Sequence, residues 1–313
     1  MRAPDFWQRR GAAALLLAPL GGLYGVSVAW KAWRAKPARV KARVICVGNL
    51  TAGGSGKTPV ALAVGARLLG EGKRVFFLTR GYGGSETGPL RVETHSTPRQ
   101  VGDEALLLAA LAPTIVARDR AAGAALAVGE GADVIVMDDG HQNFSLAKNL
   151  SLVVVDGETG FGNGLMIPAG PLREPVAQGL SRADAVIVMN GTAPDLQGYR
   201  GPVLQARLTV SGGTLTGRRV FAFAGIGRPE KFLASLNEAG AIVTGAQFFG
   251  DHHPYRPEEI AALRGRAGGA TLVTTEKDFV RLDPQTRADI AVLPVEARFE
   301  NPAALDTLLA RIA

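Results

Sequence analysis

A glycine-rich turn followed by a lysine and a threonine is the stretch of this sequence best suited to chemistry. It reads Gly53-Gly54-Ser55-Gly56-Lys57-Thr58 and lies between a short apolar run and a longer run with helical periodicity. Glycines allow backbone N–H groups to converge on an anion, and a following helix adds its partial positive charge. Lys57 can then reach the β- and γ-phosphates of a nucleotide, and the Thr58 hydroxyl can bind Mg²⁺. The turn therefore indicates a nucleotide phosphate site.

The turn departs from the strict phosphate-loop pattern, because Thr51 stands where a glycine is expected five residues before Gly56. The alternative is an ordinary glycine-rich turn between a strand and a helix. The flanks favour the phosphate loop: residues 43–47 predict a buried strand, and residues 58–69 predict a helix that tolerates Pro59 in its first turn. We expect nucleotide contacts from the whole loop, which comprises Thr51, Ala52, Gly53, Gly54, Ser55, Gly56, Lys57 and Thr58.

Two adjacent acidic residues, Asp138 and Asp139, directly follow another apolar strand, predicted over 133–137. In phosphate-loop proteins a carboxylate at such a strand end commonly completes the Mg²⁺ site. Helix capping or turn formation is the alternative use of such a pair. After a phosphate loop we favour the metal site, to which either carboxylate could contribute.

Two further polar clusters lie in loops. The segment Asp251-His252-His253 contains two of the four histidines of the chain, which is too little for a closed metal site. It is either a polar loop or a group that positions or deprotonates an acceptor hydroxyl. Arg173 and Glu174, in a loop rich in proline and glycine, form either a solvated ion pair or a phosphate-recognition site.

These residues require an α/β scaffold. Short apolar strands alternate with helices up to about residue 200, which predicts a mostly parallel sheet with helices on both faces. From about Pro202, apolar and polar residues alternate up to residue 210, and a turn follows at 211–214. This pattern predicts an antiparallel hairpin before a second, smaller α/β domain. The expected parts are an N-terminal segment 1–42, a phosphate-loop domain 43–200, a linking hairpin 201–217 and a C-terminal domain 218–313.

Size and composition indicate a globular protein of two domains, with 313 residues, 47% hydrophobic and 20% charged. The single cysteine, Cys46, excludes an internal disulfide and fits a reducing compartment. The net charge of +7 does not indicate nucleic-acid binding, because residues 1–45 hold nine Lys/Arg and one acid and the remainder carries −1. We therefore expect no nucleic-acid partner.

The N-terminal segment contains 20 residues without a charge, 11–30, with Trp7, Trp30 and Trp33 at its ends. Tryptophan at both ends and basic flanks are typical of a membrane interface. The helix could lie on or dip into a membrane, span it, or pack on the protein. Because Pro19 and three glycines interrupt it, we favour a membrane-associated helix over a span. A cleaved signal peptide is not expected in a protein that uses cytoplasmic ATP.

The chain resembles the tetraacyldisaccharide 4′-kinase family of the Gram-negative lipid A pathway over nearly its whole length. Besides the phosphate loop, the matching motifs are Val47–Thr51, Thr79–Gly83, Val101–Glu104, Asp138–Gly140, Phe161–Gly164, Pro168–Glu174, Phe223–Ile226, Asp251–His253 and Thr274–Asp278. The resemblance implies a kinase that uses ATP and Mg²⁺ to phosphorylate the 4′-hydroxyl of a tetraacylated glucosamine disaccharide 1-phosphate, giving lipid IVA. It also implies the cytoplasmic face of the inner membrane, and we expect a monomer. The alternatives are a membrane-associated phosphate-loop ATPase or GTPase switch and a nucleotide-binding scaffold.

The resemblance also implies roles for single residues. Asp103 would be the base that takes the hydroxyl proton, with His252 paired to it. Lys57 and Thr58 would hold phosphates and metal, and Asp138 or Asp139 would complete the metal site. The residues implied at the phosphates or the substrate are Arg80, Tyr82, Arg120, Gln142, Arg173 and Glu174, with Arg118 as an alternative to Arg120.

One motif departs from the family. The family usually continues Asp-Asp-Gly with an apolar residue and then Gln-His, whereas this chain has His141-Gln142-Asn143. The usual histidine is thus replaced by Asn143, and His141 takes the apolar position. Any role of the usual histidine therefore does not transfer to this chain, although Gln142 is retained.

Overall fold

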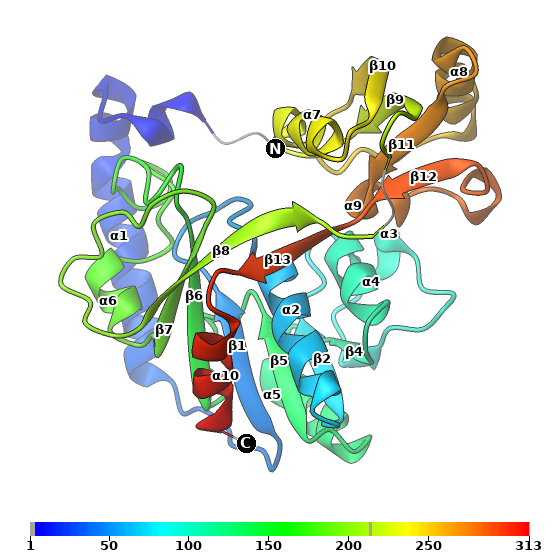
Figure 1. The fold of residues 1–313 in the computed structure, drawn as a ribbon. Helices are drawn as coiled ribbons and strands as arrows, with labels where there is room; N and C mark the ends of the chain where they lie inside the picture. The colour runs from blue at the N-terminus through cyan, green and yellow to red at the C-terminus, as the bar shows by residue number, and fades with distance from the viewer. Residues whose placement is uncertain (1–3, 213–214, 313) are drawn as a thin grey trace.

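The computed structural model of the protein describes residues 4–212 and 215–312. These residues form a large sheet with helices on both faces and a smaller sheet with its own helices (Figure 1). The prediction of an α/β fold with a large, mostly parallel sheet and a smaller α/β unit is thereby confirmed.

The large sheet has the strand order β13-β8-β7-β6-β1-β5-β2-β4-β3 within the described ranges. Its neighbours pair in parallel except at the two edges, where β13 with β8 and β3 with β4 are antiparallel. Its strands are β1 (Arg43–Gly48), β2 (Val75–Thr79), β3 (Leu90–Arg91), β4 (Thr114–Val116), β5 (Val134–Asp138), β6 (Leu150–Asp156), β7 (Ala185–Met189), β8 (Val203–Val210) and β13 (Val295–Phe299).

The strands of this sheet contribute to two cores, because successive side chains of a strand point to opposite faces. In β1, Ile45 and Val47 pack with α2 and α10, whereas Val44 and Cys46 pack with α5. Burial on both faces explains why these strands read as continuous apolar runs. The helices of the large unit are α2 (Lys57–Gly70), α3 (Pro98–Val101), α4 (Asp103–Ala109), α5 (Arg120–Gly129), α6 (Val176–Leu180) and α10 (Pro302–Ala310).

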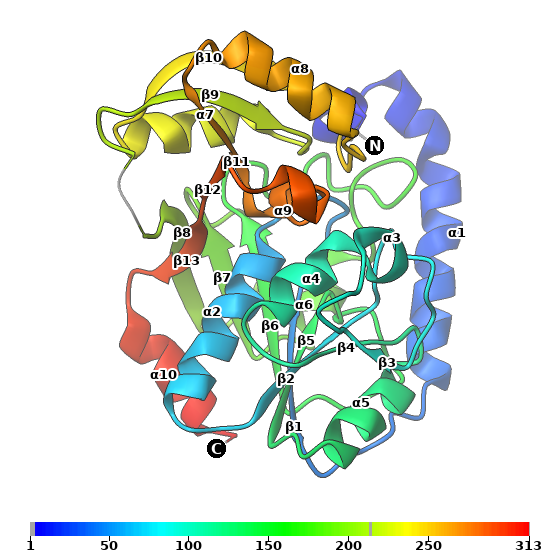
Figure 2. The same cartoon turned by 90° about the vertical axis from the view of Figure 1, so that its right-hand side faces the viewer.

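The small unit has a parallel sheet in the order β10-β9-β11-β12 (Figure 2). Two of its helices, α7 and α8, begin at a proline, because the fixed φ of proline suits the first helical turn. Its elements are β9 (Arg219–Ala224), α7 (Pro229–Glu238), β10 (Ile242–Phe248), α8 (Pro257–Ala267), β11 (Thr271–Thr275), α9 (Glu276–Phe279), η2 (Pro284–Thr286) and β12 (Ile290–Leu293).

The predicted linking hairpin over 201–217 is wrong. β8 is antiparallel to β13, near the C-terminus, and parallel to β7. Gly213 and Thr214 of the predicted turn lie outside the described residues. After the small sheet the chain returns to the large one, where α10 buries Leu305 and Leu308 in the core. The predicted C-terminal domain 218–313 is therefore not one body.

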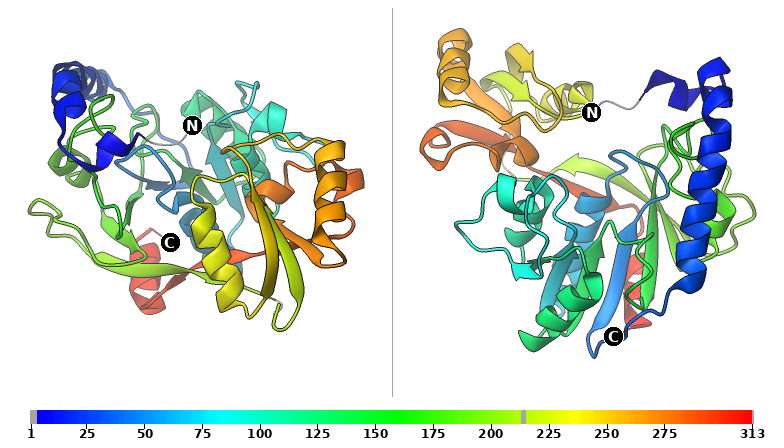
Figure 3. Two further views of the ribbon diagram at one scale, coloured as in Figure 1. Left: turned by 90° about the horizontal axis from the view of Figure 1, so that it is seen from above. Right: turned by 180° about the vertical axis from the view of Figure 1, so that it is seen from behind.

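The N-terminal segment forms η1 (Asp5–Gln8) and α1 (Ala12–Arg34), and α1 runs along the flank of the large unit (Figures 2 and 3). The helix is long and apolar enough to cross a membrane, and 22% of its most apolar window is buried. It meets the body through Ala14, Gly21 and Gly25, and a Cβ on either glycine would clash with Met166. Its exposed apolar residues are Leu15, Leu16, Leu20, Leu23, Val26, Trp30 and Trp33.

Candidate active site

The glycine-rich loop joins β1 to the N-terminus of α2. Gly53 and Gly56 have φ values of +116° and +86°, which side chains disfavour, and α2 begins at Lys57. The buried Asn49 side chain holds the loop from below, with Nδ2 2.9 Å from Ser55 Oγ. The N–H of Ala52 donates to Pro171 O at 2.7 Å, which ties the loop to the segment that carries Arg173. The predicted phosphate loop thus has a left-handed backbone and a free helix N-terminus, as anion binding requires.

Asp138 lies at the carboxyl end of β5, next to the loop. Thr58 Oγ1 donates to its Oδ2 at 2.9 Å, and its buried Oδ1 has no hydrogen-bond partner among the described residues. Burial, and to a smaller extent the negative charge of the nearby Glu104, raises the pKa of the Asp138 carboxyl to about 7. A buried carboxylate oxygen without a partner, beside a threonine hydroxyl, fits a hard divalent cation such as Mg²⁺.

Asp139 has a different environment, although it is adjacent. Its φ of +53° turns the chain away, and its carboxylate lies 2.7 Å from Arg173 Nη1 and 3.7 Å from Lys57 Nζ. Burial would raise the pKa of Asp139, but the charges of Lys57 and Arg173 outweigh it and hold the pKa below its ordinary value. The structure thus separates the pair, with Asp138 beside the hydroxyl and Asp139 among the cations.

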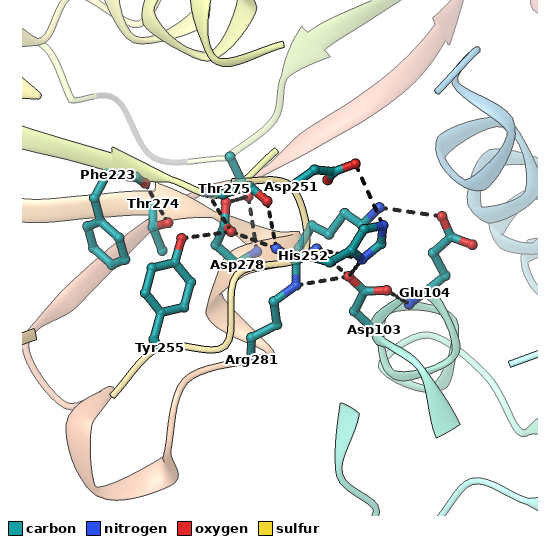
Figure 4. A network of polar contacts seen from close by, with 12 residues as sticks. Asp103, Glu104, Phe223, Asp251, His252, Tyr255, Thr274, Thr275, Asp278 and Arg281 are labelled. Atoms are coloured by element: carbon teal, nitrogen blue, oxygen red, sulfur yellow. Dashed lines mark hydrogen bonds and ion pairs between the residues drawn. The ribbon is translucent and has the colours of Figure 1, made fainter. Parts of the chain in front are cut away.

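A second cluster is centred on Asp103, the first residue of α4 (Figure 4). Its side chain is buried; His252 Nδ1 lies 3.0 Å from Oδ2, and Arg281 Nε donates to the same oxygen at 2.9 Å. Oδ1 accepts the N–H of Glu104 at 3.0 Å. Burial raises the pKa of the Asp103 carboxyl, but His252, Lys277 and Arg281 outweigh it, so the pKa lies well below its usual range. Asp103 is therefore an anion at neutral pH.

The two members of this pair come from different units. Asp103 follows Gly102, whose φ of +83° and close approach to Tyr82 O leave no room for a side chain. His252 lies in the loop after β10 with a φ of +60°, and its ring centroid is 6.1 Å from that of Tyr82. The small unit thus presents an imidazole to a carboxylate of the large unit.

A model of the tetraacyldisaccharide-1-P 4′-kinase family, LpxK, matches residues 13–313 of the chain. The chain belongs to this family. It is 52% identical to the tetraacyldisaccharide 4′-kinase of Paramagnetospirillum magneticum, covering all of this chain and 99% of the relative. It is 48% identical to that of Rhodospirillum rubrum, covering all of this chain and 98% of the relative. Its structure resembles that of Aquifex aeolicus LpxK in complex with ATP, with a TM-score of 0.78 and 27% identity over 96% of this chain and 99% of the other.

The residues that the LpxK resemblance implies at the substrate differ in their surroundings. Tyr82 and Arg80 are exposed, whereas Arg120 is buried with its Nε lacking a partner among the described residues. Burial lowers the pKa of Arg120 to about 10.

Gln142 and Glu174 are joined in a separate network beneath the Arg173 loop. Gln142 Nε2 donates to Glu174 Oε1 and to Asn49 O, both at 2.8 Å, and the buried Glu174 pairs with Arg182 at 2.5 Å. These contacts position the Arg173 loop against the phosphate loop.

The departure from the LpxK motif has a structural explanation. His141 is buried with Nε2 2.9 Å from Gly179 O, and a Cβ at Gly48 would clash with it. Burial lowers the pKa of His141 to about 4, so the ring is neutral and packs as an apolar residue would. Asn143 Oδ1 accepts the Ser145 N–H at 3.2 Å within a turn.

Three residues of the site, Asn49, Arg182 and Arg281, were not predicted from the sequence. Asn49 and Arg281 were within reach, because Asn49 belongs to the motif before the loop and Arg281 follows the Thr274–Asp278 motif by three residues. Arg182 had no local signal. The described residues contain no group of three or more His, Cys, Asp or Glu that could hold a metal ion, so a metal here would need Thr58 and the nucleotide as ligands.

Proposed function

We propose that the protein transfers the γ-phosphate of ATP to the 4′-hydroxyl of a tetraacyldisaccharide 1-phosphate, with Mg²⁺, at the cytoplasmic face of the inner membrane. The names of its relatives support the reaction, and the ATP complex of Aquifex aeolicus LpxK supports the donor. The observation that carries the proposal is the convergence of two sites. Helix α4, which begins with Asp103, packs against helix α2, which begins with Lys57 and Thr58, so the carboxylate and the phosphate loop lie side by side.

The phosphate loop and the N-terminus of α2 would bind the β- and γ-phosphates, with Lys57 neutralising their charge. Thr58 and Asp138 would hold Mg²⁺, which when bound neutralises the phosphate oxygens. Asp139 would not bind the metal itself. Its contacts with Arg173 at 2.7 Å and Lys57 at 3.7 Å would instead hold these two cations beside the phosphates.

Asp103 would accept the proton of the 4′-hydroxyl while the hydroxyl oxygen attacks the γ-phosphorus. The bond between the γ-phosphorus and the oxygen that bridges it to the β-phosphate then breaks, and ADP leaves. His252 orients the carboxylate from the small unit. Tyr82, Arg80 and Arg120 would contact the disaccharide and its phosphate. Because the site draws on both units, their relative motion would control access of the lipid to it.

Phosphate transfer from labelled ATP to the tetraacyldisaccharide 1-phosphate in mixed micelles tests this function. Asp103→Asn should reduce kcat by about 10²-fold or more, as loss of a general base does. Asp119→Asn is the matched control, because Asp119 caps α5 through similar backbone contacts. ATP hydrolysis without any lipid product would contradict the proposal and favour the switch.

The surface of α1 supports a membrane-associated protein. One narrow side of the helix packs on the body at Ala14, Gly21 and Gly25, and on the opposite side Leu16 and Leu23 are 80% and 68% exposed. A helix that packs along the body over this length lies beside it, which fits a helix in the membrane interface better than a span. An acylated substrate would remain in the membrane, since each buried CH₂ is worth roughly 0.8 kcal/mol.

Vesicle binding tests this surface. Leu16→Glu should weaken sedimentation with vesicles that contain anionic lipid, because it places a charge on the exposed apolar face. Leu111→Glu is the control, since Leu111 is an exposed leucine outside the N-terminal helix. Equal binding of the two variants would contradict a membrane role for α1.

A further inference from the structure

Asp278, at the end of the Thr274–Asp278 motif, is a fully buried carboxylate with a dense set of donors. Its Oδ1 accepts the Gly225 N–H, the Tyr255 hydroxyl and Arg281 Nη1, each at 2.9 Å. Its Oδ2 accepts the Thr275 hydroxyl at 2.7 Å. A carboxylate held by so many donors cannot reorient, so the guanidinium that it binds is held in one place.

Arg281 connects Asp278 of the small unit to Asp103 of the large unit (Figure 4). Its Nη1 also donates to Gly225 O at 2.8 Å, while Nε and Nη2 both donate to Asp103 Oδ2. The guanidinium is 5% exposed and lies between two carboxylates that are 4% and 0% exposed. Arg281 therefore fixes the base of the large unit to the core of the small unit.

The two carboxylate oxygens of Asp103 have different hydrogen-bond partners. Oδ2 receives Arg281 and His252, whereas Oδ1 accepts, within residues 4–212 and 215–312, the single N–H of Glu104. Oδ1 is thus the oxygen with capacity left to accept a proton. A carboxylate without Arg281 could rotate about its χ2 and exchange the two oxygens.

We propose that Arg281, held by Asp278, is a positioning residue for phosphoryl transfer: it orients the Asp103 carboxylate so that Oδ1 faces the acceptor hydroxyl. This inference rests on the proposed function, in which Asp103 is the base. It also assigns a role to the Thr274–Asp278 motif, whose buried carboxylate serves to hold Arg281.

The charges around Asp103 determine the expected pH dependence. The groups that face it are His252 and Asp251 from the loop after β10, Lys277, Asp278 and Arg281 from α9 and the residues after it, and Glu104 from its own helix. Removing Arg281 removes a positive charge that lowers the pKa of Asp103. The base would then become protonated at a higher pH, so the acidic limb of the rate profile should move upward.

The experiment compares kcat and KM for ATP across pH 3–9 in Arg281→Met, Arg281→Lys and Asp278→Asn, with Asp103→Asn as a reference. Arg264→Met is the matched control, because Arg264 forms an ion pair with Asp289 in the same unit, away from the site. In Arg281→Met we expect kcat to fall about 10- to 100-fold and KM for ATP to change less than about twofold. The acidic limb, which in the wild type lies below this pH range, should rise by about one to three pH units and so reach the acidic end of the range.

The other variants separate positioning from a structural role. Arg281→Lys keeps the positive charge but loses the planar, forked set of N–H donors that holds both carboxylates. Its acidic limb should therefore stay near that of the wild type while kcat falls. Asp278→Asn should act in the same direction as Arg281→Met, and the double variant should be no worse than Arg281→Met. If Arg281→Met does not fold, as circular dichroism would show, Arg281→Lys and Asp278→Asn decide the matter by the same criteria.

The outcomes distinguish this inference from the proposed function. An active wild type and an impaired Asp103→Asn, together with an Arg281→Met whose kcat and acidic limb match those of Arg264→Met, would overturn the inference alone. So would a fall in kcat with an unmoved limb, which is the result of a merely structural contact. A wild type without lipid product, or a fully active Asp103→Asn, would overturn the proposed function and this inference with it.

Discussion

Replacing Asp138 by asparagine should flatten the pH dependence of folding stability in the metal-free protein. Burial raises the pKa of Asp138 to about 7 from an ordinary value of 3.8. Because the folded-state pKa is above the unfolded one, the folded state holds this proton more tightly, and deprotonation favours unfolding. The stability is present in full below the unfolded pKa and is lost as the pH rises through the folded one.

The size of the effect follows from the two pKa values. Their difference of about three pH units corresponds to about 4 kcal/mol of unfolding free energy when both states are ionised. At pH 5.5 the unfolded state is ionised and the folded state is not, which costs about 2 kcal/mol. Between pH 5.5 and 8.5 the wild type should therefore lose about 2 kcal/mol that Asp138→Asn keeps. Comparing two pH values cancels the pH-independent cost of burying the amide.

Urea unfolding in EDTA measures this difference. Far-UV circular dichroism is the suitable probe, because Trp7, Trp30 and Trp33 all lie in or beside the N-terminal helices and their fluorescence would report on those helices. Parallel stability curves for the wild type and Asp138→Asn between pH 5.5 and 8.5 would refute the reasoning, since they would mean that Asp138 has an ordinary pKa.

Asp139→Asn is the matched control for this experiment. Lys57 and Arg173 hold the pKa of Asp139 below its ordinary value against the effect of burial. Its carboxylate therefore contributes stability that is present above the unfolded pKa and is lost as the pH falls through the folded one. Asp139→Asn should lower stability throughout pH 5.5–8.5 and should flatten the curve less than Asp138→Asn does, because the charge of Asp139 is only a minor cause of the raised pKa of Asp138.

Two further predictions concern contacts between parts of the molecule. Gly21→Ala should loosen α1 and speed its proteolysis, because the added Cβ would lie 2.8 Å from Met166 O. The control is Gly22→Ala, whose Cβ meets nothing within 4 Å and should leave the rate of proteolysis unchanged. Equal rates for the two variants would contradict this packing. Arg228→Met should leave the buried Asp156 carboxylate without its 2.8 Å partner and weaken the contact of the two units by about 1–3 kcal/mol, which solution scattering without nucleotide would show as a larger radius of gyration. An unchanged radius would mean that other contacts hold the units together.

The sequence by itself determined the phosphate loop and most of the elements. Glycine at Gly53 and Gly56 permits the left-handed turn, β-branched residues before it make a strand, and periodicity after it makes a helix. The same local rules placed Asp138 and Asp139 at a strand end. These features depend on conformational preferences within a few residues, so a short stretch of sequence contains the information that determines them.

Only the tertiary structure decided what meets across the chain. It paired β8 with β13 instead of with the residues after the predicted turn. It placed Asp138 beside Thr58 and left Asp139 to Arg173, although the two acids are neighbours. It also brought Arg281 to Asp103 across 178 residues of sequence. Strand partners and buried ion pairs depend on which surfaces exclude water together, and that is a property of the packed molecule.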